Sequence, residues 1–184
     1  MQYVSDFARR IGKRIAPYVV VAALSLACGA EAYEHGIVIS TVTRVPASTP
    51  TPDTYRCGHP EAMIFFVNAH RSENGIRGLR EDALMSKAAQ RKAEDMALNQ
   101  YFDHSSKVGI NAYNLMQDLG VQYSTTTEII AKNNYSNALE TAFRGLKKSP
   151  SHNAAILNSD FNRTGVGIAS DGNRFCYYVQ LFAD

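Results

Sequence analysis

The sequence predicts an α+β domain whose helices and strands form three layers, α/β/α. Two observations support this. Four stretches in the middle of the chain have the apolar spacing and end residues of helices, whereas the last part of the chain alternates with a period of two, as strands do. The final predicted strand is apolar or aromatic on both faces. Such a strand needs cover on both sides, which a layered sandwich provides.

The helices are expected over 60–74, 82–99, 111–119 and 136–148. Pro60 suits the first turn of the first helix, which is apolar on most sides and should be largely buried. The second helix carries a stripe made mostly of alanine, which allows a neighbouring element to approach closely. Ser136 can cap the fourth helix, and Ser149-Pro150 is expected to end it.

Two strands are expected near the C-terminus, over 165–169 and 175–182, joined by a turn at 170–173. The segment 33–45 is also rich in β-branched residues, but the sequence shows no partner for it. It is either an additional edge strand or unstructured.

The first 32 residues resemble a secretory signal peptide. A basic region is followed by an apolar run, and Ala30-Glu31-Ala32 fits a cleavage site. Two alternatives stay open, an uncleaved N-terminal anchor and a lipid anchor on Cys28. Residues 33–54 contain a Pro/Ser/Thr-rich stretch and are interpreted as an extended linker, so the folded domain is expected over 55–184. The chain is therefore predicted to be exported, to a periplasmic, cell-surface or secreted location.

Export also bears on the cysteines. If Cys28 leaves with the signal peptide, Cys57 and Cys176 remain, and an even number in an oxidising compartment favours a disulfide. The alternative is two buried thiols.

The charge balance excludes one class of partner. The net charge is +2 and the isoelectric point is about 8.4. No basic stripe with interleaved aromatic residues is present, so nucleic acid is not an expected partner.

Three residues are candidates for a functional site. His104 and His152 each follow a predicted helix in a polar segment, and Glu128 stands beside an apolar run where a carboxylate needs a partner. Two imidazoles and a carboxylate can bind a divalent metal such as zinc or polarise a water molecule. The alternative is a structural hydrogen-bond cluster. For the other histidines, we expect surface positions for His35 and His59 and a partly buried helix position for His70.

An ordered set of motifs from about Cys57 to the C-terminus resembles the CAP superfamily, the SCP-like extracellular domains of cysteine-rich secretory proteins, venom allergens, pathogenesis-related proteins and many bacterial exported proteins. The motifs are Asn68-x-x-Arg71, Gly78-Leu79, Tyr101-Phe102-Asp103-His104-Ser105, Glu128-Ile129-Ile130-Ala131, Ser149-Pro150-Ser151-His152, Ala155-Ile156-Leu157-Asn158, Gly165-Val166-Gly167 and Val179-Gln180-Leu181-Phe182.

The resemblance implies a CAP-type sandwich with a small, mostly antiparallel sheet between helices and a cavity lined by His104, Glu128 and His152. Tyr101 and Phe102 would pack behind the cavity wall. The chain departs from the family pattern in several places. Ile129 stands where the family has Asn, Asn153 where it has Arg, and Leu146 near its usual Trp, while Glu140 lies outside the family's second Glu motif.

Two functions follow as hypotheses. The first is an exported binding module whose cavity holds a lipid, glycan, peptide or envelope protein. The second is a metal-dependent or acid–base hydrolase that uses Glu128 as a base. No nucleophile elbow or His-Glu-x-x-His motif is present, and Ser105 and Ser151 are interpreted as loop formers. A vestigial cavity is the remaining alternative. Contact with a membrane is expected only through the N-terminus.

Overall fold

The computed structural model describes residues 56–184. The predicted signal peptide (1–32), Cys28, His35 and the linker (33–54) lie outside the described residues. Within them, no helix is both long and apolar enough to span a bilayer. The elements in order are α2 (Pro60–Glu73), β1 (Arg80–Glu81), α3 (Ala83–Leu98), α4 (Ala112–Asp118), β2 (Thr126–Asn133), α5 (Ala138–Lys148), α6 (Pro150–Ile156), β3 (Arg163–Ser170) and β4 (Cys176–Ala183).

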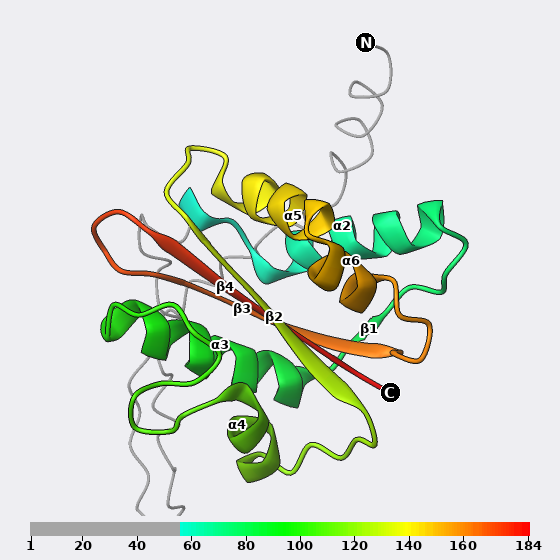
Figure 1. The fold of residues 1–184 in the computed structure, drawn as a ribbon, viewed down its shortest axis with the longest axis horizontal. Helices are drawn as coiled ribbons and strands as arrows, with labels where there is room; N and C mark the ends of the chain where they lie inside the picture. The colour runs from blue at the N-terminus through cyan, green and yellow to red at the C-terminus, as the bar shows by residue number, and fades with distance from the viewer. Residues whose placement is uncertain (1–55) are drawn as a thin grey trace, which may run out of the picture. The chain divides into compact units, whose positions relative to one another are not determined.

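The four strands form one sheet between two layers of helices (Figure 1). Their order is β1-β3-β4-β2. β1 pairs with β3 in parallel, and the other two pairings are antiparallel. Helices α2, α5 and α6 cover one face of the sheet, and α3 and α4 cover the other. The predicted α/β/α sandwich with a small, mostly antiparallel sheet is confirmed.

Strand β4 contributes to a hydrophobic core on each face of the sheet. Tyr178 and Phe182 pack with α2, α5 and α6, whereas Val179 and Leu181 pack with α3 and α4. All eight residues of β4 are buried. The prediction that both faces of the last strand are covered is therefore correct.

Helix α3 lies against β3 at a very short distance. The contact is made by two glycines of β3, Gly165 and Gly167, and by the face of α3 on which Ala88, Ala89 and Ala93 are fully buried. A Cβ atom on Gly165 would overlap the backbone of Met85, and one on Gly167 would overlap the backbone of Ala89. The alanine stripe therefore allows the close approach that the sequence predicted.

The expected helices are present with bounds within two residues of those predicted. Two details were wrong. The N-cap of α5 is Asn137 instead of Ser136. Pro150 also begins a new helix, α6, so His152 lies in a helix and not in a polar loop. Proline is compatible with the first helical position because the N–H that it lacks has no partner there.

Strand β2 was not assigned from the sequence, although its Thr-Thr-Glu-Ile-Ile run has the β-branched composition of a strand. The two-residue strand β1 was also missed.

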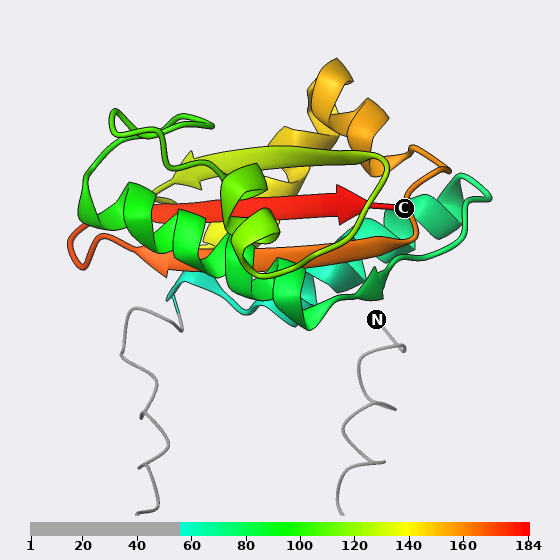
Figure 2. The same ribbon diagram turned by 90° about the horizontal axis from the view of Figure 1, so that it is seen from below.

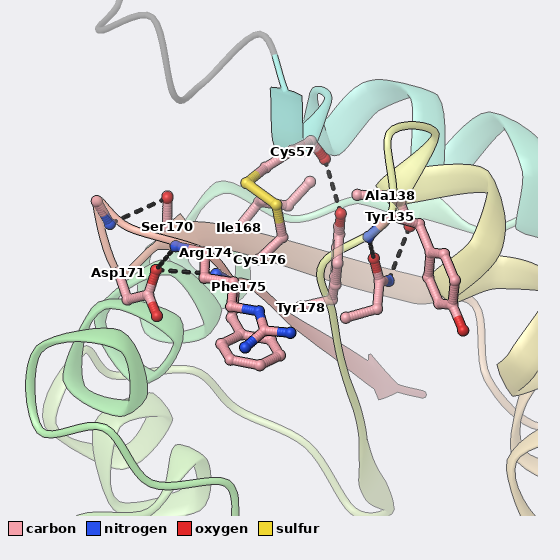
Figure 3. Close-up of a disulfide and its surroundings, with 12 residues drawn as sticks. Cys57, Tyr135, Ala138, Ile168, Ser170, Asp171, Arg174, Phe175, Cys176 and Tyr178 are labelled. Carbon is pink, nitrogen blue, oxygen red and sulfur yellow. Dashed lines mark hydrogen bonds between the residues drawn. A yellow bond between two sulfur atoms is a disulfide. The ribbon is translucent and has the colours of Figure 1, made fainter.

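A disulfide joins Cys57, just ahead of α2, to Cys176, the first residue of β4 (Figure 3). Both cysteines are buried. The Tyr178 hydroxyl donates a hydrogen bond of 3.0 Å to the Cys57 carbonyl oxygen, so the same segment is tied to β4 twice. The predicted pairing is confirmed.

Loss of the disulfide should destabilise the domain. The two cysteines are 119 residues apart. Cross-linking so long a loop reduces the entropy of the unfolded chain by the equivalent of about 4–5 kcal/mol in the chain-entropy model. We expect the Cys57→Ser/Cys176→Ser double variant to lose up to about that much unfolding free energy in urea titrations. An unchanged midpoint under non-reducing conditions would contradict the stabilising role.

The glycines of β3 provide a second test. Gly165→Ala and Gly167→Ala should each lower the unfolding free energy by about 3 kcal/mol, because the added methyl group pushes helix backbone away from the sheet. Gly145→Ala is the control. A Cβ at Gly145 meets no atom within 4 Å, and alanine is favoured in a helix, so this variant should be neutral or slightly more stable. Equal effects at all three positions would refute the close-packing explanation.

Candidate functional site

The centre of the candidate site is a contact between Glu128, on β2, and His104, in the loop after α3. His104 Nδ1 lies 2.5 Å from Glu128 Oε2. The Glu128 side chain is fully buried, whereas 53% of the His104 side chain is exposed. Glu128 therefore anchors an imidazole whose other edge faces solvent.

The second oxygen of Glu128 has no such partner. Oε1 is buried and accepts no hydrogen bond among the described residues. Burial raises the pKa of Glu128, and the hydrogen bond and charge of His104 oppose this rise. An unpartnered carboxylate oxygen beside an exposed imidazole is a polar feature that the packing of the fold does not require.

A cation lies beneath this pair. Lys92, on α3, is fully buried, and its Nζ donates a 2.8 Å hydrogen bond to the hydroxyl of Tyr101, which in turn bonds to Asp95. Burial lowers the pKa of Lys92, and the negative charges of Glu128 and Asp95 oppose this effect. Lys92 is therefore a buried positive group close to Glu128, and solvent does not reach it directly.

Helix α4 adds Tyr113 to the same side of the sheet. Burial and the nearby Glu128 carboxylate raise the pKa of Tyr113, although a hydrogen bond at the Glu128 backbone and another with the Thr127 side chain oppose the rise. Tyr113 therefore lies against β2 at the position that carries Glu128.

His152 lies on α6 and lines a cleft of about 380 Å³ beside β2. Burial lowers the pKa of His152, and the charge of His104 adds to this shift, so the two imidazoles are near one another. His152 makes no hydrogen bond to Glu128 or His104. The structure therefore brings two of the three predicted residues into contact and places the third at the adjoining cleft.

Helix α6 is fixed in place by residues of α2. His70 is buried, and its Nε2 lies 2.9 Å from the side-chain oxygen of Asn153, the residue after His152. Buried Arg71 donates hydrogen bonds to the carbonyl oxygens of Ile156 and Asn158. His70 is thus a hydrogen-bonded helix residue, buried more fully than expected, and Asn153 has a defined role in place of the family's Arg.

A preformed metal centre does not fit this arrangement. Over residues 56–184, no three His, Cys, Asp or Glu side chains lie in a group that could hold a metal ion. The Glu128 carboxylate is engaged with Nδ1 of His104, so it orients that imidazole and does not stand beside it as a third ligand. The three-ligand zinc site therefore remains a prediction from sequence that the geometry does not support.

The residues that flank the three predicted site residues in the sequence occupy different environments. Phe102 is 46% exposed and lines the cleft, so the expectation that it packs inward is wrong, while Tyr101 is partly buried in the core. Ile129 points into the opposite core from Glu128, Leu146 lines the cleft, and Glu140 pairs with Arg144 on the exposed side of α5.

Lys92 and Tyr113 were not predicted from the sequence as neighbours of the candidate site. A signal for Lys92 was available: it lies seven residues after Met85 and four before Met96, on the apolar stripe of α3. A cation at such a position needs a carboxylate nearby. No comparable signal distinguishes Tyr113 from the other tyrosines.

Comparison with known proteins agrees with this fold. The model of the CAP family, described as the cysteine-rich secretory protein family, matches residues 64–182. The chain is 29% identical over 134 residues to an uncharacterized protein of Bacillus subtilis, YkwD, and 31% identical over 120 residues to an uncharacterized membrane protein of the same organism, YlbC. These alignments cover 73% and 65% of this chain but only 51% and 33% of the two relatives.

Solved structures show the same architecture. An extracellular protein of Bacillus anthracis that contains an SCP domain superposes with a TM-score of 0.61 at 26% identity, over 74% of this chain and 45% of the other. An outer surface protein of Borrelia burgdorferi superposes with a TM-score of 0.62 at 19% identity, over 74% and 96% of the two chains. Because the family model matches well over half of the chain and the fold agrees, this chain belongs to the CAP, or cysteine-rich secretory protein, family.

Proposed function

We propose that this protein is an exported binding module that holds an envelope or extracellular ligand in the cleft beside β2. The observation that carries the proposal is the Glu128–His104 pair. It combines a buried carboxylate, an unpartnered oxygen and an exposed imidazole next to a cleft that His152 lines. The extracellular SCP-domain neighbour supports an exported or surface location.

Binding fits the geometry better than hydrolysis does. The serines next to the two histidines are not set up as nucleophiles. The Ser105 hydroxyl donates no hydrogen bond to His104, and the Ser151 hydroxyl lies 3.4 Å from another serine hydroxyl, that of Ser149. The raised pKa of Glu128 is compatible with acid–base chemistry, but no second catalytic group lies in contact with its free oxygen.

The buried state of Glu128 predicts a pH dependence of stability. Its folded-state pKa is raised above 4.5, so its contribution to stability is fully present below pH 4.5 and is lost as the pH rises through the folded pKa. The stability of the wild type relative to Glu128→Gln should therefore fall from about pH 4 to pH 7, by about 1.4 kcal/mol for each unit by which the pKa is raised.

Urea unfolding at a series of pH values measures this dependence. Glu140→Gln is the matched control, because it makes the same change at a glutamate whose side chain is 54% exposed and pairs with Arg144. If the stability difference between wild type and Glu128→Gln stays constant over this pH range, burial does not raise the pKa of Glu128.

The binding role can be tested by co-sedimentation with two probes, purified peptidoglycan sacculi and phospholipid vesicles. We expect the protein to bind at least one of them, and the His104→Ala/His152→Ala double variant to bind it about tenfold more weakly, which corresponds to about 1.4 kcal/mol. Lys87→Ala, exposed on α3, is the control. If the double variant and the control sediment alike, or neither probe binds the wild type, the cleft is not the binding site.

A further inference from the structure

Strand β2 forms one edge of the sheet. It pairs only with β4, so its second backbone edge faces away from the sheet (Figure 2). An exposed strand edge presents unpaired N–H and C=O groups that can pair with another extended chain.

The hydrogen-bond register identifies the outward groups. The N–H of Asp184 donates to the carbonyl of Thr125, and this pair extends the register of Thr126 with Ala183. Hydrogen-bonded and non-hydrogen-bonded positions alternate along an antiparallel ladder. The odd-numbered residues of β2 therefore bond to β4, and the even-numbered ones, among them Ile130 and Lys132, direct their N–H and C=O groups outward.

The other side of the sheet confirms this assignment and provides a contrast. At the outer edge of β3, beyond the end of β1, the backbone N–H and C=O of Ile168 are both bonded to the side-chain amide of Gln90, from α3. At this edge of β3, the Gln90 side chain therefore satisfies the outward backbone groups. The corresponding groups of Ile130 and Lys132 have no hydrogen-bond partner among residues 56–184.

These uncovered groups border the cleft that His152 lines. The cleft measures about 380 Å³, within the range of about 300–1,000 Å³ that is usual for ligand pockets. Its walls are Phe102 on one side and residues of α5, including Ala142 and Leu146, on the other. An extended chain that pairs with β2 would therefore find apolar surface for its side chains on both sides.

The charges along the cleft favour one kind of chain. Its lining contains Lys132 and His152 but no Asp or Glu. The ammonium group of Lys132 lies 4.5 Å and 4.7 Å from the ring centroids of Phe175 and Tyr177, and it forms no ion pair within the described part of the chain. A carboxylate on the bound chain would complement this cation.

We infer that the β2 edge binds an extended, carboxylate-bearing peptide segment of a partner protein, which adds to the sheet as a strand paired with Ile130 and Lys132. This inference rests on the proposed binding role of the cleft and specifies its ligand. Backbone hydrogen bonds supply affinity that does not depend on sequence, and the apolar walls and Lys132 supply selectivity.

The test uses a displayed library of random heptapeptides, selected against the full-length chain. Lys132→Pro removes one outward N–H, and proline is tolerated where an edge-strand N–H faces solvent. Lys132→Ala is the matched control, because it removes the same charge and keeps the N–H. We expect the selected peptides to be enriched in Asp or Glu, to bind Lys132→Ala more weakly than wild type, and to bind Lys132→Pro about tenfold more weakly again.

Amide hydrogen exchange gives a readout that does not depend on the proline variant. A bound selected peptide should slow exchange at the Ile130 and Lys132 amides of the wild-type protein, because these amides have no hydrogen-bond partner among residues 56–184. The inference is overturned if no peptide is enriched, if exchange at both amides is unchanged by a bound peptide, or if a folded Lys132→Pro binds as well as Lys132→Ala. Histidine-dependent binding to sacculi or vesicles would survive that result, so failure here is distinct from failure of the proposed function.

Discussion

The close contact between α3 and β3 determines where most of the other parts lie. Alanine on the helix and glycine on the strand bring the two backbones together, and any side chain at Gly165 or Gly167 would separate them. Because α3 is held at this distance, Gln90 reaches the edge of β3 and Lys92 is enclosed beneath Glu128. The loop that follows the helix then carries His104 to the carboxylate.

The site combines groups from both sides of the sheet at its β2 edge. Glu128, Lys92 and Tyr101 belong to the α3 side, whereas His152 belongs to α6, on the opposite side. Only an edge strand allows the two sides to meet, because every inner strand separates them completely. This explains why the groups of the candidate site gather at β2 and not at β4, all of whose residues are buried.

The elements that the sequence predicted well are those with a strong local pattern. The alanine stripe of α3, the two-sided apolar run of β4 and the cysteine pair each depend on residue types that have few alternatives. The assignment of His152 to a loop was wrong because Pro150 ends one helix and begins the next, and a proline marks both situations equally. The contact of His104 with Glu128 came from family resemblance, since 24 residues separate them and no local periodicity relates them.

The disulfide also decides how the domain responds to a pull on the chain ahead of it. Cys57 is bonded to the first residue of the central strand β4, and the residues between Cys57 and Cys176 form a closed covalent loop. Tension that arrives from the N-terminal side enters β4 directly through the sulfur atoms and bypasses α2. A load applied at Cys57 would therefore leave α2, the cleft and its histidines outside the path of the force.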